Sequence, residues 1–445
     1  MDATSYFKGK RITLMGLGLL GRGVGDARFL AEQGAVLTIT DLKSEEQLVA
    51  SLLQLQDLKN ITYRLGEHSL EDFENRDLIL KAAGVPLDSM YIAHAHALGI
   101  PVRMSADLFA ELSGIPIVGV TGTRGKSTTT HMVAHILARA GMHVLLGGNV
   151  RGVSTLSLLN EVTPQSVAVL ELDSWQLQGW GEAHMSPHVA VFTTFLPDHM
   201  NYYTGSMEKY FADKANIFLY QSESDTFVLG AQLTLFVKEF GYQAKIKAQT
   251  FVSDSSNMPK HTTLQIPGEH NRYNAGLASD AARALGVDED SIKEALESFI
   301  GVEGRLQFLG QVRGVKIYND NNSTTPDATM AALSALGNID TKNVVLIMGG
   351  SEKNLDMGPV LQVAQRMCKK VILLGGAGTE RIFSEVLQSF PDTLVYQSMS
   401  DAIPTAFTAC APGDTLLFSP AFASFGMFKN EYDRNDQFVA AVKAL

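Results

Sequence analysis

Two glycine-rich turns in this chain each follow an apolar run, and both have residues that could hold phosphate. The stretch "GVTGTRGKSTTT" at Gly119–Thr130 places Lys126 and Ser127 directly after a glycine. A strand, a glycine turn and a helix N-terminus together present backbone N–H groups to phosphate oxygens. In such a loop the lysine neutralises the β- and γ-phosphates, and the serine hydroxyl is a ligand for Mg²⁺. We therefore predict a nucleotide-binding loop here.

The loop departs from the common phosphate-loop pattern at one position. The pattern G-x-x-x-x-G-K-[ST] needs glycine where this chain has Val120, and the glycines stand at 119, 122 and 125. The other turn, "GLGLLG" at Gly16–Gly21, fits G-x-G-x-x-G after a strand, and Asp41 follows at the end of the next strand. That fingerprint is typical of NAD(P) sites, but it also binds other diphosphates or simply makes a tight turn, so all three interpretations stay open.

Residues suited to a metal follow two further apolar runs. Glu171 stands in "VLELDSWQL", and Asp198 and His199 stand in "TTFLPDHMNYY". The carboxyl ends of parallel strands meet at one sheet edge, where ligands collect. Because Mg²⁺ prefers oxygen ligands, Glu171 with Ser127 forms a reasonable magnesium site. His199 alone could equally be a core histidine, and the residue types alone give Lys214 no role beyond that of a solvated helix lysine.

The pattern of apolar runs predicts a chain of the α/β class. Strand-like runs alternate with helical patterns from residue 11 to residue 104, again from 115 to 252, and again from 343 to 420. We place the boundaries between these stretches near residues 110 and 302. We therefore predict three domains, at 1–110, 111–302 and 303–445.

Composition limits the classes of partner. The 445 residues carry a net charge of −11, which argues against nucleic acid but not against nucleotides, since a few local donors hold phosphates. Two distant cysteines support neither a disulfide framework nor a zinc cluster. No signal peptide or bilayer-spanning run is evident. We expect a cytoplasmic, monomeric protein with small-molecule partners and no membrane insertion.

Several stretches taken together resemble the Mur ligases of bacterial cell-wall synthesis, most closely the MurD type that adds D-glutamate. They are "GLGLLG", "AGVPLDS", "GVTGTRGKST", "GGNVRG", "LELDSWQL", "PDHMNYY", "ADKANIF", "GEHNRYNA", "GRLQFLG", "YNDNNSTTPDAT" and "SPAFASFGMFKN". Their order and spacing also fit, and Val120 agrees with that family's loop, T-G-[TS]-x-G-K-[ST]. The resemblance implies a Rossmann-like N-terminal domain, a central ATPase-type domain with a mostly parallel sheet, and a Rossmann-like C-terminal domain.

The resemblance also implies a reaction. ATP would phosphorylate the free carboxylate of UDP-N-acetylmuramoyl-L-alanine, the amine of glutamate would attack the acyl phosphate, and phosphate would leave. Mg²⁺ and Lys126 would bridge the two anions, with Lys126, His199 and Lys214 as catalytic residues. Since the site would be shared among three domains, closure on binding would exclude water. In many members the lysine matching Lys214 is carbamylated.

The resemblance further implies four sets of site residues. The metal ligands are Ser127, Glu171, His199 and Lys214. The ATP site comprises Gly122, Thr123, Arg124, Gly125, Lys126, Ser127, Thr128, Asn271, Asn274, Arg305 and Asp320. The UDP-substrate site comprises Gly18, Leu19, Leu20, Asp41, Leu42, Asn149, Gln176 and His199. The amino-acid site comprises Asn322, Thr324, Lys353, Ser424 and Phe425.

Two positions depart from the MurD pattern and keep alternatives open. Asp173 replaces the first serine of S-S-F-Q-L, so it could bind metal through water or alter the muramyl contacts. Asn322 replaces a lysine that helps hold a glutamate carboxylate, and an amide brings no charge. L-glutamate or another amino acid therefore remains an alternative acceptor. Rival functions are a folyl-polyglutamate type of ligase, an NAD-dependent oxidoreductase and a non-catalytic nucleotide-binding regulator.

Overall fold

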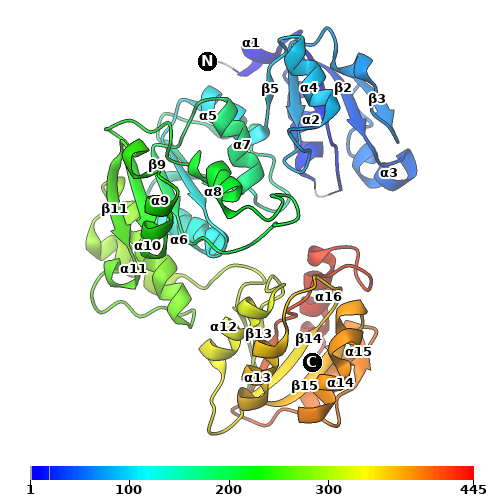
Figure 1. Ribbon diagram of the computed structural model, residues 1–445, viewed down its shortest axis with the longest axis vertical. Coiled ribbons are helices and arrows are strands. Elements are labelled where there is room, and N and C mark those ends of the chain that lie inside the picture. Colours follow the sequence, from blue (N-terminus) through cyan, green and yellow to red (C-terminus); the bar gives the residue numbers. More distant parts are fainter. Residues whose placement is uncertain (1–2, 20) are drawn as a thin grey trace. The chain divides into compact units, whose positions relative to one another are not determined.

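The N-terminal part of the chain forms a five-stranded, fully parallel sheet with the strand order β3-β2-β1-β4-β5. The structure is a computed structural model that describes residues 3–19 and 21–445 (Figure 1). The strands are β1 (Arg11–Met15), β2 (Val36–Asp41), β3 (Ile61–Leu65), β4 (Leu78–Lys81) and β5 (Val102–Arg103). The helices are α1 (Ala3–Phe7), α2 (Arg22–Glu32), α3 (Glu45–Leu53), α4 (Met90–Ala97) and α5 (Ser105–Ser113). The order 3-2-1-4-5 is that of a Rossmann-like sheet.

The sequence of β4 explains why helices cover both faces of this sheet. Leu78 and Leu80 pack with residues of α2 and α5, while Ile79 between them packs with residues of α4. Successive side chains of a strand point to opposite faces, so an unbroken apolar run is buried on both sides. The carboxyl edge of the sheet stays available for a ligand.

The central part of the chain forms a six-stranded sheet with the order β11-β10-β9-β6-β8-β7, in which all neighbours are parallel. The strands are β6 (Ile117–Thr121), β7 (His143–Gly148), β8 (Ser166–Glu171), β9 (Val189–Phe192), β10 (Thr226–Gly230) and β11 (Gln249–Ser253). The helices are α6 (Lys126–Arg139), α7 (Ser174–Glu182), α8 (Met207–Ala215), α9 (Thr234–Glu239), α10 (Glu269–Ala284) and α11 (Glu289–Ser298). Since β8 and β9 flank β6, the loops that follow these three strands share one edge.

The C-terminal sheet has the order β12-β13-β17-β14-β15-β16, with only the β12–β13 pair antiparallel. The strands are β12 (Gln307–Val312), β13 (Val315–Asn319), β14 (Val344–Gly349), β15 (Cys368–Leu374), β16 (Val395–Tyr396) and β17 (Thr415–Phe418). The helices are α12 (Pro326–Leu336), α13 (Gly358–Met367), α14 (Ala377–Ser389), α15 (Met399–Thr408) and α16 (Glu431–Lys443). Alternate residues of β14 join two different apolar clusters, so this sheet is also buried on both faces.

The predicted α/β class is confirmed, because strands alternate with helices over each of the three predicted stretches. The pattern of apolar runs in the sequence did not predict β3 or the β12–β13 hairpin. The chain forms two compact units, one from its start to Lys260 plus Asn274–Ala295, the other from His261–Tyr273 plus Leu296–Leu445. The domain bounds at 110 and 302 stay predictions. Within the described residues, no helix combines the length and apolar character needed to cross a bilayer.

One buried carboxylate connects α2 to segments that follow β5 and β7. Asp26 accepts hydrogen bonds from the hydroxyls of Ser105, at 2.8 Å, and Ser154, at 2.6 Å. Burial raises the pKa of Asp26 to about 6, and both serine hydrogen bonds oppose that shift. A side chain at Gly25 would place its Cβ 2.6 Å from the Cβ of Ser154, so glycine permits this close approach. The segment after β7 is thereby held against α2.

Candidate active site

The loop between β6 and α6 is shaped by two glycines that no other residue could replace without movement. Gly122 has φ +146°, and a Cβ there would lie 2.0 Å from the hydroxyl of Thr193. Gly125 has φ +84°, and its Cβ would lie 2.4 Å from the amide oxygen of Asn274. The loop therefore lies tightly against the segment after β9 and against α10. Gly125 caps α6, so the first turn of that helix faces the loop, as a phosphate site requires.

Two lysines converge on one carbonyl oxygen of this loop. The Nζ atom of Lys126 donates to the oxygen of Gly122 at 2.8 Å and to that of Thr123 at 3.2 Å. The Nζ atom of Lys214, from α8, donates to the same Gly122 oxygen at 3.1 Å. The structure thus brings together two predicted catalytic residues that lie far apart in the sequence.

The environment of Lys214 differs from that of an ordinary helix lysine. Its side chain is buried, and a 3.4 Å hydrogen bond joins its Nζ to the hydroxyl of Thr121. Burial lowers the pKa of Lys214 well below its usual value, and the nearby charge of Lys126 lowers it further. The amine is therefore biased toward its neutral, nucleophilic form.

His199 lies in a strained turn beside an ion pair. Its φ is +54°, a left-handed conformation that non-glycine residues seldom adopt outside specific turns. Asp198 accepts from Nη1 of Arg124 at 3.1 Å and lies 4.0 Å from Nε2 of His199. Burial lowers the pKa of His199, and Lys126 and Lys214 lower it too, against the opposing effect of Asp198. A neutral imidazole is favoured, which can act as a ligand or as a hydrogen-bond partner.

The predicted metal ligands Glu171 and Ser127 lie at the same sheet edge. Glu171 ends β8, where it pairs with Val120 of β6, and Ser127 is in the first turn of α6. Both side chains are buried. Carboxylate and hydroxyl oxygens suit Mg²⁺, so the donor set fits that ion. Across residues 3–19 and 21–445, no cluster of three acidic, histidine or cysteine side chains is suited to hold a metal. The magnesium site therefore stays a prediction.

Asp173, which departs from the MurD pattern, caps helix α7. Its carboxylate accepts from the backbone N–H of Gln176 at 2.8 Å, and the Gln176 side chain accepts from the backbone N–H of Asp173 at 3.1 Å. This reciprocal pair is a capping box. It also fixes the side-chain oxygen of Gln176, a predicted contact of the muramyl substrate.

We expect Asp173→Ala to lower the free energy of unfolding by about 1 kcal/mol, because the first turn of α7 would lose its side-chain cap. Asp173→Ser should retain most of that energy, since serine is also a good N-cap. Chemical denaturation of the three proteins measures both values. Equal losses for alanine and serine would show that the cap contributes nothing and that the charge matters instead.

The first glycine-rich turn is held by Asp41. One carboxylate oxygen accepts from the backbone N–H of Gly18 at 3.0 Å, and the other accepts from that of Lys43 at 2.9 Å. Leu19 and Leu42 are both more than half exposed beside this turn, at 54% and 67%. Leu20, predicted with them as a UDP contact, lies outside the described residues. Two exposed leucines next to a glycine turn could cover an aromatic base.

Three further predicted ATP contacts, Asn271, Arg305 and Asp320, belong to the second unit, whereas Asn274 belongs to the first. Asp320 is buried and accepts from the backbone N–H of Leu306 at 2.9 Å and from the hydroxyl of Ser419 at 2.8 Å. Burial raises the pKa of Asp320 to about 6. Arg305 is half-buried in the same unit, and its charge acts against that shift. Asn271 and Asn274 lie about one turn apart on α10, which crosses the division between the units.

The predicted amino-acid contacts also gather in the second unit. Nζ of Lys353 donates to the hydroxyl of Thr324 at 3.0 Å, so these two predicted residues meet. Ser424 is buried, whereas Phe425 is 63% exposed. The amide of Asn322 donates to the carbonyl of Glu303 at 3.3 Å and therefore braces a neighbouring turn.

Two arginines that the sequence did not single out form hydrogen bonds beside predicted site residues. Arg434 is fully buried and donates to the side chain and the carbonyl of Asn321, both at 2.8 Å, and to the carbonyl of Phe422 at 3.1 Å. It thereby joins the two loops that carry Asn322 and Ser424. Arg22 follows the first glycine turn and contacts Asn149 at 2.7 Å. An arginine directly after a glycine-rich turn is the one signal that could have revealed Arg22.

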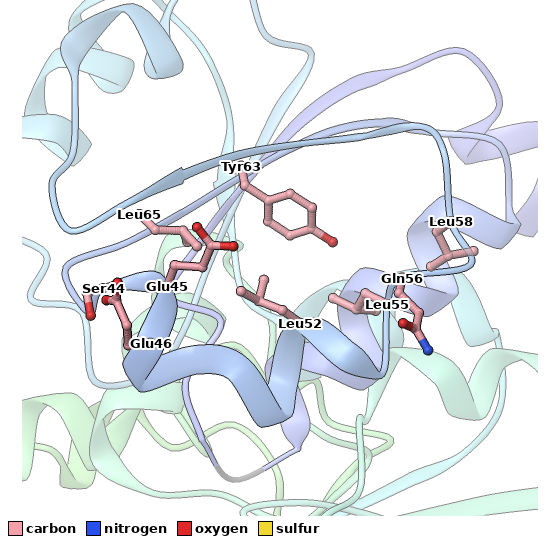
Figure 2. A pocket seen from close by; sticks show the side chains of 9 residues that line it. All are labelled: Ser44, Glu45, Glu46, Leu52, Leu55, Gln56, Leu58, Tyr63 and Leu65. Carbon is pink, nitrogen blue, oxygen red and sulfur yellow. The ribbon is translucent and has the colours of Figure 1, made fainter.

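A separate cavity of about 480 Å³ lies between α3 and β3. Figure 2 shows Tyr63 and Leu65 on one side and Leu52 and Leu55 on the other, with Glu45 close by. None of the predicted site residues lines it.

A tightly packed glycine loop, a lysine folded over it and a fully parallel sheet define a nucleotide-using α/β enzyme. Family models for three successive Mur ligase regions match the chain. They are the MurD-like N-terminal domain at residues 10–104, the middle domain at 120–282 and the glutamate ligase domain at 304–422. The chain belongs to the Mur ligase family, whose members are ATP-dependent amide ligases that act in peptidoglycan synthesis.

Relatives of nearly equal length share about a third of their residues with this chain. A protein of Roseiflexus sp. named UDP-N-acetylmuramoylalanine–D-glutamate ligase is 34% identical, over 98% of this chain and 99% of its own. One of the same name from Streptococcus sanguinis is 34% identical over the whole of both chains. This membership sets aside the oxidoreductase interpretation of "GLGLLG".

Solved structures show the same fold at lower identity. A MurF ligase from Thermotoga maritima in complex with ADP aligns with a TM-score of 0.60, at 15% identity, over 100% of this chain and 96% of its own. A UDP-N-acetylmuramate–alanine ligase from the same organism aligns with a TM-score of 0.58, at 19% identity, over 98% and 99%. These likenesses bear on the fold alone.

Proposed function

We propose that this protein joins D-glutamate to UDP-N-acetylmuramoyl-L-alanine at the expense of ATP. The observation that carries the proposal is the full-length likeness, at 34% identity, to proteins named as ligases for that reaction. The convergence of Lys126 and Lys214 on the Gly122 carbonyl supports it, because a phosphoryl transfer between two anions needs cations beside the loop.

In the first proposed step, a carboxylate oxygen of the UDP-linked substrate attacks the γ-phosphorus of ATP and ADP leaves. Lys126 offsets the repulsion between carboxylate and phosphate and stabilises the charge of the transferring group. In the second step, the amine of glutamate attacks the acyl carbon, the C–O bond to phosphate breaks and an amide forms. The amine gives up a proton, and inorganic phosphate leaves with the bridging oxygen.

Bound Mg²⁺ would supply positive charge at the phosphate oxygens and help to orient them. Ser127 and Glu171 would hold it, with His199 and Lys214 supporting a second ion. The depressed pKa of Lys214 supports the idea that this lysine is carbamylated, because a neutral amine is the form that reacts with CO₂. A carbamate would turn the buried amine into an oxygen donor.

The two glycine-rich turns then take different ligands. The turn at Gly16–Gly21 would hold the UDP part of the substrate, with Leu19 and Leu42 near the uracil. The loop at Gly119–Thr130 would hold ATP, and Asn274, packed on Gly125, would contact the adenine side. We further propose that Asn149, Gln176 and His199 contact the muramyl portion.

The amino-acid site is proposed to lie around Lys353 and Thr324, which already contact each other. Lys353 would bind a carboxylate of glutamate, and Ser424 with Phe425 would complete the site. Asn322 can donate only neutral hydrogen bonds, so Lys353 would provide the main charge. L-glutamate or another amino acid remains the alternative acceptor.

The predicted domain bounds give each substrate its own part of the chain. We propose that residues 1–110 bind the UDP-substrate, 111–302 bind ATP, and 303–445 bind the amino acid and contribute Arg305 and Asp320 to ATP. We expect a cytoplasmic monomer, and light scattering of the purified protein would check that it is monomeric.

We expect amino-acid-dependent phosphate release when the protein is mixed with ATP, Mg²⁺, UDP-N-acetylmuramoyl-L-alanine and D-glutamate. A phosphate assay and the product mass measure this outcome. Omitting the UDP-substrate is the matched control, and it should reduce the rate to background. Release with L- but not D-glutamate would refute the stereochemistry alone, whereas no release with any amino acid would refute the proposed function.

A further inference from the structure

Arg22 begins a chain of hydrogen bonds that runs from the first glycine-rich turn toward the ATP site. Its Nη1 donates to Oδ1 of Asn149 at 2.7 Å. Nδ2 of the same amide donates to Oε1 of Glu171 at 3.3 Å. Backbone contact reinforces this arrangement, since the N–H of Asn149 donates to the carbonyl of Glu171 at 2.7 Å. A cation, an amide and a carboxylate are thus joined in series.

The chemistry at the two ends of this series fixes how the amide is turned. A guanidinium only donates, so the Asn149 atom that faces Arg22 must be the oxygen. An ionised carboxylate only accepts, so the atom that faces Glu171 must be the nitrogen. Both contacts therefore require the same orientation of the amide plane, and that orientation also engages one specific oxygen of Glu171.

We propose that Arg22 is a positioning residue for the ATP-bound metal, acting through the amide of Asn149 on the carboxylate of Glu171. This inference rests on the proposed function, in which Glu171 holds Mg²⁺. The hydrogen bond from Asn149 to Oε1 restricts rotation of the Glu171 carboxylate, which would hold the ion when it is bound. Groups that orient a metal ligand typically change metal affinity by about 10–100-fold when they are removed.

The position of Arg22 gives the series a second consequence. Arg22 is the first residue of α2, directly after the glycine-rich turn proposed to hold the UDP-substrate. Asn149 is itself a proposed contact of the muramyl portion. A change in Arg22 should therefore alter the metal requirement of the ATP site, although Arg22 lies on a helix of the domain proposed to bind the other substrate.

Three substitutions separate positioning from mere charge. Arg22→Lys keeps a donor-only group and should leave the Mg²⁺ dependence within about threefold of the parent. Arg22→Met removes the hydrogen bond to the Asn149 oxygen and keeps only the one to Glu171. The affinity for Mg²⁺ should fall by an amount between those of Arg22→Lys and Arg22→Glu. Arg22→Glu replaces the donor that faces Asn149 with an acceptor, so the amide would turn its oxygen toward Glu171. The affinity for Mg²⁺ should then fall by about tenfold or more.

The readout is the Mg²⁺ concentration at which ADP binding, measured by calorimetry, is half-maximal. It requires neither turnover nor the UDP-substrate, so it stays interpretable even if another acceptor is used and the proposed function fails. Arg28→Met is the matched control, because Arg28 lies on the same helix but pairs with Asp57 and Glu32 at the surface. It should leave the Mg²⁺ dependence unchanged.

A double-mutant cycle gives the decisive result. In an Asn149→Ala background, Arg22→Glu should change the Mg²⁺ requirement by less than about twofold, because the intermediary is gone. Thermal unfolding of each variant identifies any that fail to fold, and Arg22→Lys then supplies the comparison. The inference would be overturned if Arg22→Glu weakened Mg²⁺ binding equally with Asn149 present and with Asn149→Ala. It would also be overturned if all three Arg22 variants bound Mg²⁺ like the parent.

Discussion

Lys126→Met should lower kcat by about 10²–10³-fold while ADP still binds. A charged donor aimed at a transferring phosphoryl is worth that much in the transition state, whereas the loop's backbone N–H groups continue to hold the nucleotide. Methionine matches the length of the lysine stem, so the loop should keep its packing against Thr193 and Asn274. Steady-state phosphate release, with ADP affinity from calorimetry, measures both parts of this expectation.

Lys126→Arg serves as the control for charge. It retains a cation but replaces a point charge with a planar fork, so it should recover part of the rate and not all of it. A rise in the KM for ATP with kcat intact would show that Lys126 contributes only uniform binding. Turnover of Lys126→Met within threefold of the parent would remove this lysine from the chemistry.

Lys214→Ala should abolish measurable turnover, and added bicarbonate should not restore it. The substitution removes the only amine of α8 that reaches Gly122 and the one proposed to carry a carbamate. Phosphate release in the presence and absence of bicarbonate tests the rate. Because alanine leaves a cavity at a fully buried position, Lys214→Met provides a packed version with the same expected loss.

Lys209→Ala is the matched control on the same helix, since Lys209 is exposed and should be dispensable. A direct test of the modification uses ¹³C-labelled bicarbonate and NMR. The parent should show a carbamate carbon signal that Lys214→Met lacks. Full activity of Lys214→Met would exclude Lys214 from the mechanism, and full activity without the carbon signal in the parent would exclude the modification alone.

The sheets were predictable from the sequence because their strands are apolar runs buried on two faces. Leu78–Leu80 of β4 show this, with neighbours packed alternately on opposite sides. β3 escaped notice because its side chains are exposed or half-exposed and its sequence, ITYRL, contains no unbroken apolar run. The β12–β13 hairpin was hidden for a similar reason, since all six residues of β12 are partly buried or exposed.

The phosphate loop could also be predicted from a short stretch of sequence, because its glycines and Lys126 lie within a few residues of one another. Lys214 could not, since nothing in "YFADKANIF" shows that its amine points at Gly122. Its predicted role rests on the resemblance, and the fold adds that its amine donates to the Gly122 carbonyl at the end of β6. Arg434 was missed for the same reason, because burial and its bonds to Asn321 are properties of packing across the second unit.

Asp26 also bears on how pieces of this enzyme could be exchanged with those of its relatives. A chimera cut at residue 110 would separate the carboxylate of Asp26 from Ser154, and the donor's residue there need not supply a hydroxyl. A buried carboxylate that loses a donor typically costs about 1–3 kcal/mol. The smallest exchangeable module is therefore not a continuous N-terminal piece. It is that piece together with the segment around Ser154, whose closeness to Gly25 demands that both be inherited from one parent.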